Sequence, residues 1–265
     1  MDAFDRIQPR WHFWQLCGNY PLLERTTTLG GNMKRIFVPT QTGADWQRLL
    51  AKPELHWKVG ASAMTAAAAW EAASDSLPPE IATLLDSTEQ PELMRQRLLV
   101  AIPEWQVSLP GGTTASCTDV LALCHNDTGI CVLGVEAKVR EKFGQLLAEK
   151  RSKTSAGQSE RLAYLHNLLG VKHFEDSIRY QLLHRTASAL LTARDFHAAS
   201  AVMLVHAFDT PASQRSDFLA FVKAMDGTEV APLVYRVKSF EHPSLYLAWC
   251  NGDPQFRQRQ LPSAL

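Results

Sequence analysis

Two carboxylates and one ammonium group stand close together in this sequence, at Asp119, Glu136 and Lys138. Residues 118–124 and 130–135 are short apolar runs, and a turn rich in Asp, Thr and Gly separates them. This pattern predicts two antiparallel strands joined by a tight turn. Pairing across that turn would bring Asp119 next to Glu136. Lys138 would share a face with Glu136, because side chains alternate along a strand.

Such a group of side chains suits the hydrolysis of phosphodiesters with the help of a metal ion. Hard divalent cations such as Mg²⁺ or Mn²⁺ prefer oxygen ligands, and Mg²⁺ often uses only one or two carboxylates together with water and substrate phosphate. Asp119 and Glu136 offer those oxygens, and a bound ion lowers the pKa of its water. Lys138 would orient the nucleophile or stabilise negative charge that develops on the phosphate.

These residues resemble the core motif of the PD-(D/E)XK, or restriction-endonuclease-like, superfamily, except that no proline precedes Asp119. The resemblance spans about Met33 to Trp249 and is to an uncharacterised bacterial branch of that superfamily. The segments that carry it are His56-Trp57-Lys58-x-Gly60-x-Ser62-Ala63, Trp70-Glu71, Gly111-Gly112, Glu136-x-Lys138-Val139-x-Glu141-x-Phe143-Gly144 and Arg179-Tyr180-Gln181-Leu182-Leu183-His184-Arg185.

The resemblance implies an α/β fold with a mixed central β-sheet flanked by helices on both faces. It also implies a nuclease that cuts DNA with Mg²⁺ or Mn²⁺, in genome defence or repair. In that superfamily a glutamate on the first helix often joins the metal site, which makes Glu71 a third candidate ligand. A glutamine or basic residue on the helix after the Glu-x-Lys strand often reaches the active site, which favours Gln181 and then Arg185.

Each of these residues also has an ordinary structural interpretation. Glu and Lys two positions apart on a strand often form an exposed ion pair, worth less than about 1 kcal/mol. Glu71, Gln181 and Arg185 would then be surface residues on packed helices. Residues 129–135 are almost continuously apolar, however, which is typical of a strand buried on both faces. A charged pair at the end of a buried strand favours a catalytic role over a solvated one.

Two functions of different classes follow from this pattern. The first is a metal-dependent nuclease, and the second is a catalytically silent protein of the same fold that binds nucleic acid or another partner. The complete set of Asp, Glu and Lys favours the nuclease. A third hypothesis, a hydrolase with Cys117 or Cys124 as nucleophile, is disfavoured. Neither thiol lies at a predicted helix N-terminus, where its pKa would be lowered.

Charge balance restricts where nucleic acid can bind. The 265 residues contain 27 Lys and Arg against 27 Asp and Glu, so contact with DNA requires a local basic patch rather than an overall positive charge. The most basic stretch follows Lys138 and offers Arg140 and Lys142 as phosphate contacts, with Arg185 from a later helix.

Cysteine usage and hydropathy bear on the compartment. The five cysteines show no CxxC spacing, which favours reduced thiols over a disulfide framework or a zinc site. No apolar run approaches the length that spans a membrane. We therefore expect a cytoplasmic protein with no membrane partner. Its oligomeric state stays open, with a homodimer among the alternatives.

The remaining pattern predicts one domain over 33–265, preceded by an extension of uncertain order at 1–32. Met33 is a candidate start, and an ordered N-terminal arm is the alternative. From Asn251 the polar tail is expected to be loose. The elements expected beside the hairpin are helices over 45–51, 63–74, 78–85, 158–169, 177–193 and 213–225, and strands over 33–39, 104–109, 198–208, 233–237 and 245–249.

Overall fold

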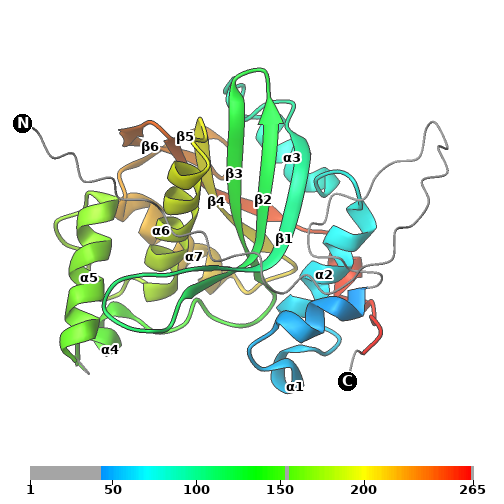
Figure 1. Cartoon of the computed structure of the whole chain (residues 1–265), viewed down its shortest axis with the longest axis horizontal. Coiled ribbons are helices and arrows are strands. Elements are labelled where there is room, and N and C mark those ends of the chain that lie inside the picture. The colour runs from blue at the N-terminus through cyan, green and yellow to red at the C-terminus, as the bar shows by residue number, and fades with distance from the viewer. Residues whose placement is uncertain (1–42, 153–154, 264–265) are drawn as a thin grey trace, which may run out of the picture. The chain divides into compact units, whose positions relative to one another are not determined.

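The structure, a computed structural model, describes residues 43–152 and 155–263. These residues form an α/β fold with one mixed sheet of seven strands and helices on both of its faces (Figure 1). The predicted fold class is thereby confirmed, while its restriction-endonuclease-like character stays a prediction. The extension at 1–32 and the strand expected at 33–39 lie outside the described residues. In the ranges described, no helix is long and apolar enough to cross a membrane.

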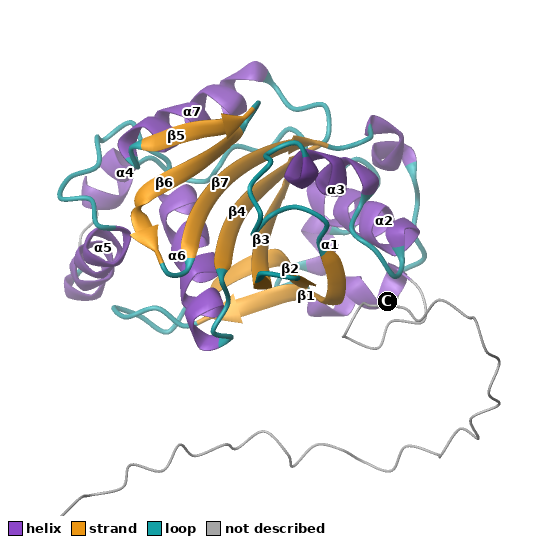
Figure 2. Cartoon of the chain, turned by 90° about the horizontal axis from the view of Figure 1, so that it is seen from above, coloured by secondary structure: helices purple, strands orange, loops and turns teal. Residues whose placement is uncertain are grey.

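The sheet has a parallel centre with antiparallel strands on both sides. Its order is β1-β2-β3-β4-β7-β6-β5, with β3, β4 and β7 parallel and the other neighbours antiparallel. Figure 2 shows its strong twist. The strands are β1 (Arg97–Val107), β2 (Ser116–Asn126), β3 (Gly129–Lys138), β4 (Ser200–Ala207), β5 (Gly227–Ala231), β6 (Val234–Glu241) and β7 (Ser244–Asn251).

Two hydrophobic clusters cover the two faces of this sheet. One cluster packs α5, α6 and α7 against β2, β3 and β4, and the other packs η1, α2 and α3 against the opposite face. The helices are η1 (Gly43–Leu49), α1 (Pro53–His56), α2 (Ser62–Ala73), α3 (Pro79–Asp86), α4 (Leu147–Ser152), α5 (Ala156–Leu169), α6 (Tyr180–Asp195), α7 (Ala212–Ala224) and η2 (Pro254–Gln258), of which η1 and η2 are 3-10 helices.

The predicted hairpin is present as β2 and β3. Cys124 pairs with Cys131 and Asn126 with Gly129, so Asp127 and Thr128 form a two-residue turn. The Asn126 side chain accepts a hydrogen bond from the Thr128 backbone N–H at 2.9 Å, which is the local bonding that favours Asn in turns. The prediction of this hairpin from its turn chemistry and apolar runs is confirmed.

Gly134 lets α6 approach β3 closely. A Cβ at Gly134 would lie 3.0 Å from the Cβ of Ala189, which leaves almost no room for a larger residue. Since Arg185 and Gln181 lie about one and two turns before Ala189 on α6, this close contact holds them over the end of β3. The packing of one small pair of residues therefore positions two polar side chains.

Two helix starts differ from the sequence prediction. The helix expected from Ser177 begins at Tyr180, because the backbone before it pairs with the segment ahead of α4: Leu147 N–H donates to Ile178 O, and Tyr180 N–H donates to Gln145 O. The helix expected from Ala63 begins one residue earlier, at Ser62, with Ala61 in the N-cap position. Tertiary hydrogen bonds therefore set the start of α6. The start of α2 differs from the prediction by one residue.

The C-terminal tail is not loose, so that prediction was wrong. Within it, η2 packs Phe256 against the small cluster formed by Ala69, Val139 and Phe208. Further along, Trp57 donates its indole N–H to the carbonyl of Pro262 at 3.2 Å. Leu261 packs into the cluster that holds α2 and α3. The tail thus covers helices that form one wall of the candidate site.

We expect the double substitution Phe256→Ala and Leu261→Ala to lower the free energy of unfolding by about 2–4 kcal/mol, because both side chains are half-buried. Urea denaturation would measure it. Gln258→Ala with Gln260→Ala, at exposed positions of the same tail, is the matched control and should change stability by less than about 0.5 kcal/mol. Equal stability of the two double variants would contradict this role of the tail.

Candidate active site

The β2–β3 hairpin brings the two predicted carboxylates together. Val120 pairs with Val135, which places Asp119 beside Glu136 at the end of the pair. The Asp119 carboxylate also accepts a hydrogen bond from the backbone N–H of Ala137 at 2.7 Å. Here a side-chain carboxylate takes the place of a backbone carbonyl as the acceptor between β2 and β3. The bond anchors Asp119 at Ala137, the residue between Glu136 and Lys138.

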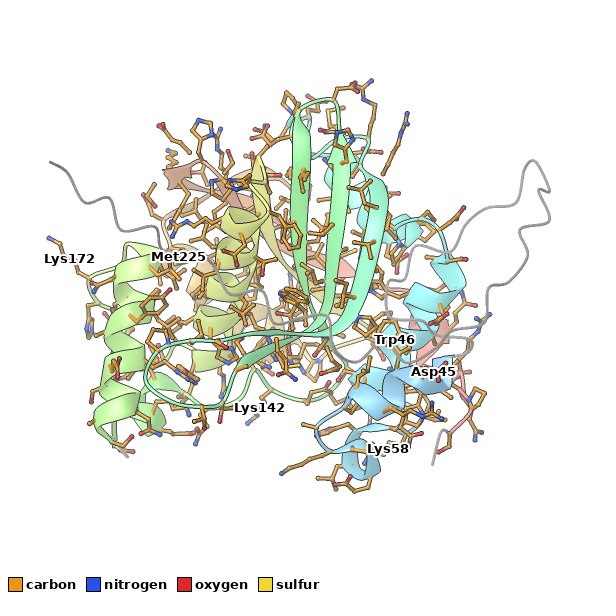
Figure 3. The ribbon with its side chains drawn as sticks, in the orientation of Figure 1. Asp45, Trp46, Lys58, Lys142, Lys172 and Met225 are labelled. Carbon is orange, nitrogen blue, oxygen red and sulfur yellow. The ribbon has the colours of Figure 1, made fainter. Side chains whose placement is uncertain are left out.

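Asp119, Glu136 and Lys138 line one cavity of about 850 Å³. Gln181 and Arg185 of α6 line it too, as do Lys58 and the residues around it in the α1–α2 segment. Figure 3 shows the labelled Lys58 and Lys142 near the same lower edge of the molecule. The predicted convergence of the three charged groups is therefore confirmed, and they line a cavity.

Glu136 is the electrostatic centre of this cavity. It is 2 % exposed, and Lys138 Nζ donates to its Oε1 at 2.6 Å while Gln181 Nε2 donates to the same oxygen at 2.8 Å. Arg185 Nε donates to the other oxygen, Oε2. Burial acts to raise the pKa of Glu136, but Arg185 and Lys138 outweigh it and hold the pKa at about 2. Glu136 is therefore ionised throughout the physiological range.

The pKa of Asp119 is shifted in the opposite direction from that of Glu136. Burial raises its pKa well above the ordinary value, and repulsion from Glu136 and Glu104 raises it further, against the attraction of Arg185 and Lys138. Glu104 of β1 is affected in the same direction: burial is the main cause of its raised pKa, and Glu136 adds to it. The cavity thus crowds three carboxyl groups, and its charge would be relieved by a bound cation.

Arg185 connects this cluster to the start of β2. Its Nη1 donates to Ser116 Oγ at 3.1 Å, and Ser116 Oγ lies 2.8 Å from Nδ1 of His184. Burial, with Arg185 next in importance, lowers the pKa of His184 to about 3, so this imidazole is neutral. Arg185 is buried rather than on the surface. It holds Glu136 in place, and this position does not suit the surface phosphate contact predicted for it.

The structure places the other predicted residues as follows. Gln181 reaches the cluster, and Arg140 and Lys142 line the same cavity. Glu71 does not: it lies near the C-terminal end of α2, where its carboxylate accepts a hydrogen bond from the Trp46 indole at 2.8 Å. Only the beginning of α2, at Ser62 and Ala63, lines the cavity. At 1.5 Å per residue, eight helical positions put Glu71 about 12 Å along the axis from Ala63.

The sequence prediction missed Glu104, and it considered Cys117 only as a disfavoured nucleophile. Cys117 Sγ donates to Glu104 Oε2 at 2.9 Å, and both residues line the cavity. The feature that could have indicated Glu104 is the register of β1 on β2. Pro103 pairs with Val120 and Trp105 with Thr118, which sets Glu104 opposite Asp119. Burial and the neighbouring Glu104 raise the pKa of Cys117, so its thiol stays protonated. This state disfavours Cys117 as a nucleophile.

A divalent cation of this kind needs oxygen donors, and the cavity offers a small set of them. Within the described residues, no group of three or more His, Cys, Asp and Glu side chains is arranged to hold a metal ion. Mg²⁺ nevertheless needs only one or two carboxylates when water and substrate phosphate complete its shell. Asp119 and Glu136 provide this minimum. Gln181 adds a buried Oε1 that has no hydrogen-bond partner among these residues.

A family model described as "Domain of unknown function (DUF6946)" matches residues 39–254 of the chain. No curated protein and no solved structure matches the chain. The family match includes β1 to β7 and every residue of the cavity named above.

Proposed function

The chain belongs to the DUF6946 family, and we propose that its cavity at the end of the β2–β3 hairpin hydrolyses phosphodiester bonds of DNA with a divalent metal ion. One observation carries this proposal: two acidic side chains, a lysine and a glutamine from separate elements converge on one cavity. A phosphodiesterase needs hard oxygen ligands, a cation for the developing charge and a group that orients water.

The proposed ligands are Asp119 and Glu136, with Mg²⁺ or Mn²⁺ as the ion. The chemistry supplied by such an ion is neutralisation of phosphate charge and a lower pKa for a coordinated water. Two features support this assignment. Asp119 has a raised pKa because burial and two neighbouring acids oppose its ionisation, and a nearby cation would favour the ionised form. Glu136 is already ionised.

Lys138 and Gln181 have separate roles in this proposal. One N–H of the Lys138 ammonium bonds to Glu136, and the other two can donate to a phosphate oxygen or to the attacking water. Gln181 donates through Nε2 to Glu136 and helps to hold that carboxylate in the cavity. Arg185 stays bonded to Glu136 and keeps that carboxylate in position.

The outer part of the cavity supports DNA as the substrate. Lys58, Arg140 and Lys142 line it together with Glu141. Cations placed around an acidic site attract a polyanion, and they supply the local positive charge that the balanced composition does not.

A catalytically silent binding protein is the second candidate. It is favoured by the saturation of Glu136, whose two oxygens accept bonds from Lys138, Gln181 and Arg185. Such a network can be purely structural, in which case the site would bind nucleic acid without cutting it.

The decisive experiment uses the purified full chain with linear, circular and single-stranded DNA, and with RNA. We expect cleavage of DNA with Mg²⁺ or Mn²⁺, none with EDTA, and binding without turnover with Ca²⁺, whose larger shell tolerates looser geometry. Calorimetric titration with Mg²⁺ reports metal binding separately. Absence of both heat of binding and cleavage would overturn the nuclease in favour of the silent protein.

A further inference from the structure

A second cavity, of about 450 Å³, lies beside the candidate active site and shares Cys117 and Arg185 with it. Its walls come from the β1–β2 connection and from helices α4, α5 and α6. Figure 1 shows this connection sweeping from the end of β1 toward α5 before it returns to β2. The two cavities therefore adjoin along the start of β2, and one extended ligand could occupy both.

The second cavity has cationic walls. Of the residues that the structure describes, its lining includes Lys150, Arg161 and Arg185 but no Asp or Glu. The charge of Arg185 is balanced by Glu136. Among the residues that the structure describes, no ion pair joins Lys150 or Arg161 to a carboxylate. Two uncompensated positive charges thus remain.

Arg161 also fixes the shape of the cavity. Its guanidinium donates to four backbone carbonyls of the β1–β2 connection, at Leu109, Pro110, Gly112 and Thr114, over 2.8–3.1 Å. Carbonyl groups are neutral, so these bonds hold the loop without cancelling the charge. The walls are therefore preformed around a cation.

Gly111 brings this loop against α5. It has φ +78°, and a Cβ there would lie 2.0 Å from the carbonyl oxygen of Gly157. A side chain cannot fit at that distance, so the loop and the first turn of α5 meet through glycine.

Lys150 is the side chain best placed to meet a ligand. It lies over the ring of Tyr180, with Nζ 4.7 Å from the ring centroid, and Tyr180 also lines the cavity. This contact orients the ammonium and leaves its hydrogen-bond donors available. His184 in the same wall has a lowered pKa, caused first by burial and then by Arg185, with smaller contributions from Lys150 and Arg161. These contributions agree with a positive potential inside the cavity.

We propose that this second cavity binds a phosphate group of the nucleic-acid substrate while a neighbouring phosphodiester lies at Asp119 and Glu136. A phosphate group suits this cavity because Lys150 and Arg161 bring two positive charges to a preformed wall. No acidic side chain among the described lining residues would repel it. The shared wall at Arg185 connects the two positions. The inference rests on the proposed nuclease for its substrate, but the phosphate site can be measured without catalysis.

The test measures binding of fluorescein-labelled short single-stranded DNA to the full chain in EDTA, with a 5′-phosphate or a 5′-hydroxyl end. Lys150→Gln should weaken binding about tenfold, as expected when one charge-assisted contact is lost, and should lower the salt slope by about 1. Lys150→Arg should retain most of the affinity. Lys172→Gln is the matched control, because Lys172 is exposed and projects away from the site (Figure 3).

The two ends of the probe distinguish the source of the phosphate. Loss of affinity only with the phosphorylated end identifies a terminal phosphate, whereas equal loss with both identifies an internal phosphodiester. Equal binding by wild type and Lys150→Gln, with intact folding by circular dichroism, would overturn the inference. Because the assay contains no metal, a protein that fails to cut DNA can still show the Lys150 effect. An active nuclease can likewise lack it.

Discussion

Replacing Lys138 by methionine is expected to reduce DNA cleavage by about 10²-fold or more while Mg²⁺ binding persists. Methionine keeps most of the length of the side chain but removes the donors that would stabilise the phosphate or orient water. Glu136 keeps its bonds to Gln181 and Arg185 in this variant, so the proposed metal ligand stays in position. Single-turnover cleavage and calorimetric titration would measure the two effects separately.

The acidic residues should behave differently from Lys138. Asp119→Asn and Glu136→Gln should each lose both Mg²⁺ binding and cleavage, because each change removes a charged oxygen ligand. Glu71→Gln is the matched control, since Glu71 bonds to Trp46 away from the cavity, and it should cut DNA at the wild-type rate. Cleavage by Lys138→Met at that rate would contradict the role given to lysine. Loss of DNA cleavage in Glu71→Gln alone would instead indicate that the active site lies nearer α2.

Replacing Arg185 by methionine is expected to lower the free energy of unfolding by about 3–5 kcal/mol. The change leaves the buried charge of Glu136 without its strongest partner, and breaking a buried pair from one side is costly. Adding Glu136→Gln removes the unpaired charge and should restore most of the loss. Urea denaturation of the two single variants, the double variant and wild type gives the coupling between the residues. Additive effects would mean that this ion pair is weak.

The same pair predicts how stability depends on pH. The pKa of Glu136 is about 2 in the folded protein against an ordinary value of 4.5. Its stabilisation should therefore be fully present above pH 4.5 and be lost as the pH falls toward 2, by an amount on the order of 3 kcal/mol. Glu136→Gln should lack this part of the acid slope, and an unchanged slope would contradict the assigned pKa shift.

The contribution of Asp119 to folding stability should depend on pH in the opposite direction. Because burial and repulsion raise its pKa, its contribution is most favourable below its ordinary pKa of 3.8 and is lost as the pH rises through the folded-state value. Asp119→Asn should therefore be more stable than wild type at neutral pH in EDTA. Added Mg²⁺ should narrow that difference if Asp119 is a ligand, because a ligand that binds only the folded state stabilises it.

Local sequence was sufficient for the central hairpin and its charged end. Turn chemistry between two apolar runs set the register of β2 on β3, and that register alone puts Asp119 beside Glu136. Gln181 and Arg185, which the family resemblance favoured, are four residues apart and therefore neighbours on one face of α6. A tight turn and helical spacing are local features of the chain, so sequence determines both patterns.

Other features depended on partners far away in the sequence. Glu104 joined the acidic cluster through the pairing of β1 with β2, whose connection is held by Arg161 of α5. Glu71 was kept out of the cluster, and its carboxylate bonds to Trp46 of η1 instead. The start of α6 moved because residues 145–148 pair with its approach. Long-range backbone hydrogen bonds and close packing decide such positions, and no local propensity encodes which distant partner will fill them.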